Sequence, residues 1–174
     1  FTSSLPGYRN FGDETALKEY AQKANVPENI VPRERGYKYA EIIDAIDRGE
    51  IKALWIVATN PLVSFVNQKK LRATLAKLDL LVVQDAFMSD TAELADVVFS
   101  AATWGEKEGV YTNSERRCNR ANKAVEPTGD TKSDFDIVLE FSKYFDGVNE
   151  LLFPEWKKPI DAFEEMKVLS EGQL

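Results

Sequence analysis

Three short apolar runs in the middle of the chain are each followed by polar residues. The runs cover residues 51–58, 80–84 and 97–101 and are rich in Val, Ile and Leu. Each is short enough to be a buried strand. The first run stops at Thr59-Asn60-Pro61, where proline can no longer donate a ladder hydrogen bond. The pattern therefore predicts three strands, each of which ends in a polar loop.

The segments between these runs have helical character. Residues 67–77 are predicted to form a helix, because Leu71, Leu75 and Leu78 follow one another at helical spacing. Asn67 can cap the start of this helix. Asp90 followed by Glu93 indicates the start of a short helical turn. A strand, a helix and a strand in succession predict a parallel pair with a right-handed crossover. We therefore expect an α/β fold with a mostly parallel sheet flanked by helices, a Rossmann-like dinucleotide-binding lobe.

Further helices are predicted on both sides of this region. One helix should begin after Asp13, and another should end at Gly49. A third should run from Ser133 or Asp134 to Gly147, and a last one should begin at Pro159. We expect residues 1–174 to form a single domain, since a chain of this length can bury one core. Within it, residues 1–50 form a helical lead-in, residues 51–117 a βαβ core and residues 118–174 helices that pack on the sheet.

Polar residues at the strand ends predict a binding edge. In open parallel sheets, ligands sit outside the carboxyl ends of the strands. Asn60 and Ser64 suit phosphate oxygens, and Asp85 stands where an acid often contacts a ribose hydroxyl. An ordinary NAD or FAD site is disfavoured because the GxGxxG turn is missing. The residues expected to share this rim are Thr59, Asn60, Ser64, Gln84, Asp85 and Thr91.

Composition excludes several classes of function. The net charge of −7 argues against nucleic acid as the main partner, and no apolar run approaches the length of a membrane span. The sequence has no histidine, which excludes Ser-His and Cys-His nucleophiles and imidazole zinc sites. Cys118 alone cannot supply an iron–sulfur cluster, and Glu106 and Glu108 fit a polar loop better than an acid–base pair. We expect no catalytic or metal-ligating residue in this segment.

The order of three motifs carries a family resemblance. ATNPLVSF, LDLLVVQDAF and TAELADVVFSAATWGEKEGVYTNSERR together resemble the molybdopterin-dependent oxidoreductases that bind a bis(molybdopterin guanine dinucleotide) cofactor. Within that family the resemblance is strongest to the catalytic subunit of bacterial assimilatory nitrate reductases, and formate dehydrogenases come next. It extends from about Leu5 to the last residue and is most specific over residues 59–117. The first residues lack an initiator Met, and we expect an internal piece of a larger enzyme.

The resemblance implies a set of cofactor-binding residues. The residues after the first strand would lie against the phosphate-bearing arm, Asp85 near the guanosine, and the last motif over the pterin. The set is Thr59, Asn60, Pro61 and Ser64 after the first strand, Gln84 and Asp85 after the second, Thr91 at the short helix, and Trp104, Glu106, Gly109, Thr112, Asn113, Ser114, Glu115, Arg116 and Arg117 in the last motif.

The resemblance also implies an activity and partners. The parent enzyme would be a cytoplasmic oxidoreductase of nitrate assimilation that reduces nitrate to nitrite, with molybdenum and an iron–sulfur cluster bound outside this segment. Its partners would be the other domains of the same catalytic subunit, an electron donor protein and a small oxyanion, and the isolated piece would be inactive. Two alternatives stay open: the equivalent domain of a formate dehydrogenase alpha subunit, and a non-catalytic nucleotide-binding or interaction domain.

Single residues of the set also have simpler interpretations. Asp85 could cap the turn that follows it, as Asp residues at strand ends often do. Arg116 and Arg117 would ordinarily be a solvated pair, and Trp104 a packing residue. Cys118 lies outside the position of the metal ligand in the family and fits a small buried hydrophobic residue better.

Overall fold

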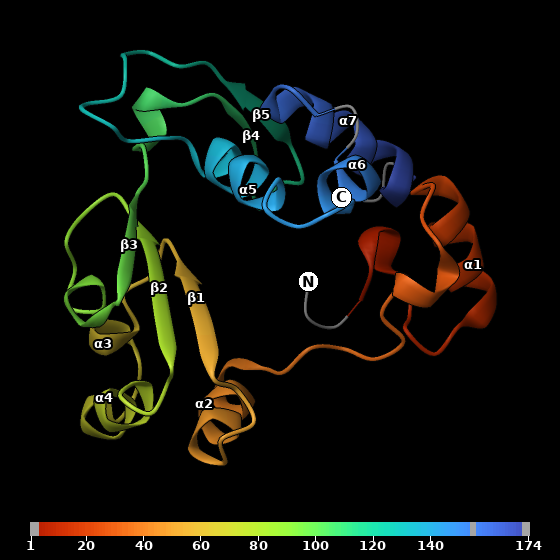
Figure 1. Ribbon diagram of the computed structural model, residues 1–174. Helices are drawn as coiled ribbons and strands as arrows, with labels where there is room; N and C mark the ends of the chain where they lie inside the picture. Colours follow the sequence, from red (N-terminus) through yellow and green to blue (C-terminus); the bar gives the residue numbers. More distant parts are fainter. Residues whose placement is uncertain (1–3, 154–155, 172–174) are drawn as a thin grey trace. The chain divides into compact units, whose positions relative to one another are not determined.

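The computed structural model describes residues 4–153 and 156–171. The chain groups into two compact units (Figure 1). The sheet unit consists of Tyr37–Glu106 and Val125–Ile137, and the hairpin unit consists of Phe1–Gly36, Lys107–Ala124 and Val138–Leu174. Each unit is described by itself below. The prediction of a single domain with a lead-in, a core and C-terminal helices stays a prediction.

The sheet unit is built on three parallel strands in the order β1-β2-β3. They are β1 (Ala53–Val57), β2 (Leu80–Asp85) and β3 (Val97–Ser100), and they lie side by side in Figure 1. The central strand β2 buries Leu81 and Val83, as its apolar run predicts. The expected α/β fold with a parallel sheet flanked by helices is therefore confirmed.

Amphipathic helices supply the rest of this core. Its helical elements are α2 (Tyr39–Asp47), α3 (Pro61–Ser64), α4 (Gln68–Leu75), η3 (Ala92–Leu94) and η4 (Trp104–Glu106). Ile43 and Ile46 of α2 pack with Leu71 and Leu75 of α4 in one cluster. Asn67 caps α4 as predicted, since its side chain accepts a hydrogen bond from the Lys70 amide at 3.1 Å. The crossover between β1 and β2 is thus fixed by an apolar face and a polar cap.

The hairpin unit combines helices with one antiparallel ribbon. Its elements are η1 (Pro6–Tyr8), α1 (Glu14–Lys23), η2 (Glu28–Ile30), β4 (Gly109–Thr112), β5 (Cys118–Ala121), α6 (Val148–Leu152) and α7 (Pro159–Ser170). The helix α5 (Asp134–Ser142) begins in the sheet unit and ends in the hairpin unit. Asp13 caps α1 and Pro159 opens α7, as the sequence predicts. Leu17 and Ala21 of α1 pack with Leu5 and Val31.

Two features differ from the expectations. The strand β5 has no apolar alternation, because its residues Cys-Asn-Arg-Ala are mostly exposed, and the sequence pattern does not predict it. The helix expected to run to Gly147 ends at Ser142, and α6 begins after Gly147, whose φ of 73° suits a helix boundary. Among the described residues, no helix has both the length and the apolar character needed to cross a bilayer.

Candidate functional site

The three parallel strands end at one edge of the sheet. Val57 is paired with Gln84, and Asp85 with Ser100, so the loops after β1, β2 and β3 leave the sheet at the same level. We call this the carboxyl edge. The predicted site residues at or near this edge are Thr59 and Asn60 after β1, Pro61 and Ser64 in α3, Gln84 and Asp85 at the end of β2, Thr91 before η3, and Trp104 in η4.

Two of these residues form a latch between the loops after β1 and β2. The Thr91 hydroxyl donates a hydrogen bond to Asn60 Oδ1 at 2.7 Å and accepts one from the Leu62 amide at 3.2 Å. Thr91 is fully buried, whereas Asn60 is partly exposed. The Ser64 hydroxyl donates to the Asn60 carbonyl at 3.1 Å. These side chains therefore shape the loop after β1, and the exposed Thr59 is left at its outer surface.

Thr91 of the latch also acts as the N-terminal cap of α3. Pro61 occupies the first position of α3, and the Asn60 side chain makes no cap hydrogen bond. The first amides of a helix have no partner inside the helix. Thr91 accepts from the amide at the second position, Leu62, and so caps α3 from another loop. The short helix at the carboxyl edge thus depends on the loop after β2.

A strained residue begins the loop after β1. Ala58 has φ 53°, a left-handed conformation that costs a non-glycine residue about 1–2 kcal/mol. Its amide donates to the Gln84 carbonyl at 2.8 Å, which continues the pairing of β1 with β2 up to the point of strain. Strain of this kind clusters at functional sites. Sequence reasoning missed Ala58 because nothing in an alanine marks a left-handed backbone.

Asp85 is used as a turn cap in this structure. Its Oδ1 accepts from the Phe87 amide at 3.1 Å, and its Oδ2 accepts from the Ser89 hydroxyl at 3.4 Å. The simpler interpretation of Asp85 is therefore observed. A carboxylate has about four acceptor sites, so these two hydrogen bonds leave capacity for a ligand hydroxyl or amine. Phe87 is 73% exposed beside it.

Gln84 lies inside the fold and not on its surface. The side chain is fully buried, and its Nε2 donates to Asp134 Oδ1 at 2.6 Å. Its Oε1 is buried without a hydrogen-bond partner among the described residues. Buried acceptors of this kind normally have a donor, which a bound molecule or an ordered water can supply.

The loop after β3 is held by a carboxylate. Glu106 Oε2 accepts from the Thr103 amide at 2.7 Å and from its hydroxyl at 2.9 Å, and Oε1 accepts from the Thr128 hydroxyl at 3.4 Å. The hydrogen bonds from Thr103, and then those from Thr128, lower the pKa of Glu106. Trp104 in the same loop is 77% exposed, so it does not pack in the core of the sheet unit. Its ring is available to a ligand or to another segment of polypeptide.

The remaining predicted residues lie on the ribbon of the hairpin unit. They are Gly109 and Thr112 on β4, and Asn113, Ser114, Glu115, Arg116 and Arg117 in the turn that leads to β5. The ribbon belongs to the hairpin unit and is described by itself, so a site shared by these residues and the carboxyl edge stays a prediction.

A single side chain shapes the turn of the ribbon. Asn113 Oδ1 accepts from the Glu115 amide and from the Arg117 amide, each at 3.0 Å. Arg116 has φ 61°, and its amide donates to the Asn113 carbonyl at 3.0 Å. Ser114, Arg116 and Arg117 are exposed. Asn113 thus orders a turn that presents two guanidinium groups to solvent, and their role as cofactor contacts stays a prediction.

The described residues offer no cluster of three or more His, Cys, Asp or Glu side chains placed to hold a metal ion. Cys118 is exposed, and its thiol lies 3.3 Å from the Thr112 hydroxyl across the ribbon. The prediction of a buried cysteine is therefore wrong, since β5 is a solvent-facing strand. What the carboxyl edge offers is a set of donors and acceptors for binding.

Comparisons with known proteins agree with this arrangement. The family model "Molybdopterin oxidoreductase" matches residues 5–144. The chain is 42% identical over 162 residues to "Nitrate reductase" of Symbiobacterium thermophilum, covering 88% of this chain and 21% of that protein. It is 38% identical over 166 residues to "F420-dependent formate dehydrogenase subunit alpha" of Methanocaldococcus jannaschii, covering 94% and 23%.

A solved structure shows the same fold. "Acetylene Hydratase from Pelobacter acetylenicus" superposes with a TM-score of 0.65 at 26% identity, covering 91% of this chain and 22% of that chain. The chain spans 21% and 23% of the length of the two relatives described above. Their names differ in substrate, so identity at this level does not determine the substrate. The family implies a molybdenum–pterin cofactor, and the chain belongs to the molybdopterin oxidoreductase family.

Proposed function

We propose that this chain is a molybdopterin guanine dinucleotide-binding part of a molybdenum oxidoreductase that reduces nitrate to nitrite. The observation that carries the proposal is the carboxyl edge, where the loops after three parallel strands leave the sheet at one level and the first two are joined by the hydrogen bond between Thr91 and Asn60, beside the strained Ala58. Ligands of open parallel sheets bind at such edges. The larger protein would bind the second guanine dinucleotide arm, the iron–sulfur cluster and the molybdenum ligand elsewhere.

The chemistry of the edge fits a nucleotide. Thr59 offers an exposed hydroxyl for phosphate oxygens. Asp85 retains acceptor sites for the N–H groups of a guanine or the hydroxyls of a ribose. When bound, the cofactor supplies the electron-transfer chemistry, and the residues of this chain bind and orient it.

The guanidinium groups of the ribbon are suited to bind an anionic ligand. Arg116 and Arg117 are exposed on an ordered turn, and planar guanidinium groups bind phosphate and other oxyanions in two-point geometry. Such a turn would serve the diphosphate of the cofactor or the nitrate ion. Partners would be the other domains of the same subunit and an electron donor protein in the cytoplasm.

A second candidate is the same part of a formate dehydrogenase. The observation that favours it is the 38% identity to a formate dehydrogenase subunit, which extends over 94% of this chain. The cofactor, the carboxyl edge and the role of its residues would be the same in both cases. Only the substrate of the larger protein would differ.

Substitution of Asp85 tests the binding role in the full-length protein. Asp85→Asn keeps an oxygen that can cap the Phe87 amide but removes the charge, and a charge-assisted hydrogen bond is about 1–2 kcal/mol stronger than a neutral one. We expect about tenfold weaker retention of guanine nucleotide, measured as GMP released by acid hydrolysis of the washed protein. The matched control is Asp79→Asn, because Asp79 is exposed at the opposite end of β2.

The outcomes separate the classes of function. Equal GMP content in wild type and both variants would refute the role of Asp85. Absence of GMP from the wild-type protein would refute the guanine dinucleotide site and favour an interaction domain. Comparison of viologen-linked nitrate reduction with formate oxidation in one preparation then decides the substrate, because formate turnover alone would exclude the nitrate assignment.

A further inference from the structure

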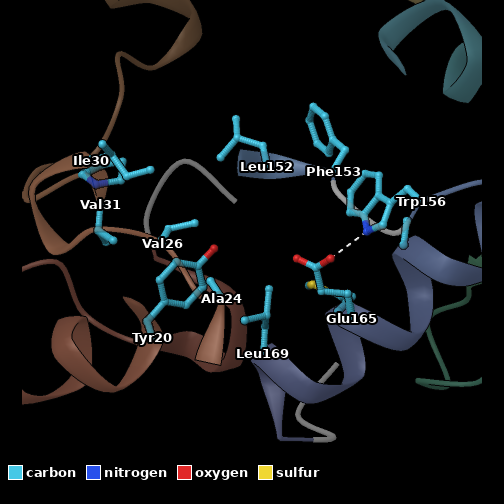
Figure 2. A pocket seen from close by; sticks show the side chains of 13 residues that line it. Tyr20, Ala24, Val26, Ile30, Val31, Leu152, Phe153, Trp156, Glu165 and Leu169 are labelled. Carbon is cyan, nitrogen blue, oxygen red and sulfur yellow. Dashed lines mark hydrogen bonds between the residues drawn. The ribbon is translucent and has the colours of Figure 1, made fainter. Parts of the chain in front are cut away.

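The hairpin unit contains a pocket that the proposed function does not use. It has a volume of about 330 Å³ and is formed by α1, the loop after it, the end of α6 and one face of α7 (Figure 2). This volume is within the range of about 300–1,000 Å³ that is typical of sites for small molecules. All of its lining residues belong to the same compact unit.

The walls of the pocket are aliphatic and aromatic. Val31 and Leu169 are buried in its lining, at 6% and 7% exposure. The rings of Phe153 and Trp156 contact each other, with centroids 4.7 Å apart, and Tyr20 lies on the other side of the pocket in Figure 2. A ligand in this space would therefore contact apolar carbon and the faces or edges of aromatic rings.

Among the described residues that line the pocket, Glu165 alone carries a charged group. Glu165 Oε2 accepts a hydrogen bond from the Trp156 indole at 2.6 Å, which fixes the carboxylate beside the aromatic ring. Figure 2 shows the Glu165 carboxylate and the Tyr20 hydroxyl directed into the same space. Burial, and then the negative charge of Glu165, raise the pKa of Tyr20, whereas the charge of Arg9 opposes this shift. The phenol therefore stays neutral at physiological pH.

The nearby cations are engaged elsewhere. Arg9 pairs with Glu171 Oε1 at 3.0 Å and also donates to the carbonyl oxygens of Pro6 and Leu169. Lys23 pairs with the same oxygen of Glu171. No described residue forms an ion pair with Glu165. The negative charge in the pocket is consequently not neutralised by the neighbouring part of the fold that the structure describes.

We propose that this pocket binds a small organic ammonium ion. The ammonium would pair with Glu165, and the carbon chain would lie against Val31, Leu169 and the aromatic rings. Aromatic faces attract cations, and a carboxylate in partly apolar surroundings interacts with a cation more strongly than one in water. An anion would be repelled by Glu165, and a neutral chain would leave that charge desolvated without a partner. The site belongs to the hairpin unit and does not depend on the proposed function.

Calorimetric titration of the full-length protein tests the site. The probes are n-hexylammonium chloride, 1-hexanol and sodium hexanoate, which share the same chain and differ in the charge of the head group. We expect saturable binding of one hexylammonium, with affinity at least about tenfold higher than that of hexanol, and no binding of hexanoate. The reason is that the ion pair with the partly buried Glu165 should contribute more than about 1.4 kcal/mol, which corresponds to a tenfold change in affinity. Equal affinity for hexanol, or absence of hexylammonium binding at millimolar concentration, would overturn the proposal.

Two adjacent residues of α7 provide the matched variants. Glu165→Gln keeps an oxygen for the Trp156 indole but removes the charge, and should weaken hexylammonium binding about tenfold or more. Glu164→Gln removes a charge on the exposed side of α7, where Glu164 pairs with Lys167 at 2.7 Å, and should leave binding unchanged. An equal loss in both variants would show only a general electrostatic effect and would overturn the assignment of Glu165. If Glu165→Gln does not fold, the titration of the wild-type protein with the three probes still tests whether the pocket prefers an ammonium ion.

Discussion

Removal of the Thr91 hydroxyl should release the loop after β1 without changing the sheet. Thr91→Val replaces a hydroxyl by a methyl group of similar size at a fully buried position. The change deletes the hydrogen bond to Asn60 Oδ1 and the acceptor of the Leu62 amide. Threonine and valine have the same shape, so the effect reports the lost hydrogen bonds and not a cavity.

The two lost hydrogen bonds differ in cost. Asn60 is partly exposed, so its oxygen can accept from water instead, and the net loss there is small. Leu62 is 5% exposed, and its amide is at the second position of α3, where the helix itself provides no acceptor. A buried donor left without a partner costs about 1–3 kcal/mol. We therefore expect local destabilisation of about 2 kcal/mol, which corresponds to about thirtyfold faster opening of the loop.

Hydrogen exchange with residue resolution measures this opening in the full-length protein. The Leu62 amide should exchange about thirtyfold faster in Thr91→Val than in wild type, while the amides of β2 should keep their rates, because opening of the loop leaves the ladder between β1 and β2 intact. Thr91→Ser retains the hydroxyl and serves as the control, with a change of about fourfold for one methyl group lost from the core.

A Leu62 amide that exchanges at the same rate in wild type and Thr91→Val would refute the assignment of Thr91 as the cap of α3. Equal acceleration in the serine and valine variants would show that loss of the methyl group costs as much as loss of the hydroxyl, and it would refute a specific role of the hydroxyl as the cap. Acceleration throughout β2 would mean that the substitution destabilises the whole sheet unit, which the exposed position of the carboxyl edge does not predict.

Three further predictions concern single positions. Gly7→Ala should lower stability by about 1–2 kcal/mol in thermal unfolding, because φ is 75° and an added Cβ would lie 3.2 Å from a backbone oxygen at the end of α7, whereas Gly12→Ala, with no atom within 4 Å, should change little. Asp13→Ala should cost about 1 kcal/mol through loss of the cap of α1, and Asp13→Ser should recover most of it. Hydrogen bonds from Thr103 hold the pKa of Glu106 below its ordinary value of 4.5, so the stability that the ionised Glu106 gives to the fold is complete above pH 4.5 and is lost as the pH falls through the lowered pKa. In wild type, exchange of the Thr103 amide should therefore accelerate as the pH falls below 4.5, and in Glu106→Gln this acceleration should be absent.

The elements that sequence reasoning predicted are those with a local physical cause. The three strands follow from apolar runs that end in polar residues, and the cap at Asn67 follows from the chemistry of one side chain. The hairpin strand β5 was missed because its stability comes from pairing with β4, and its own residues carry no apolar alternation. Pairing between segments leaves little trace in the composition of a solvent-facing strand.

The candidate site was predicted in part for a similar reason. Parallel strands bring their carboxyl ends together, so the placement of Asn60, Asp85 and Thr91 follows from topology alone. Topology does not tell which side chain points outward. Gln84 and Thr91 are fully buried, and the strain at Ala58 depends on a backbone conformation that no alanine announces. The Glu165 pocket was not predicted either, because its two sides come from opposite ends of the chain.

The hydrogen bonds of the carboxyl edge distinguish residues that shape the edge from residues that have groups available to a ligand. Asn60, Ser64 and Thr91 bond mainly to one another and to the backbone, so they set the shape of the edge. Thr59 and Asp85 keep groups available to a ligand. Proteins whose names specify nitrate, formate and acetylene all share this part of the chain. If the proposed function holds, the structure in common serves the cofactor, and the choice of substrate depends on residues outside the latch. It follows that Thr91→Val should weaken cofactor retention without altering which substrate the full-length protein accepts.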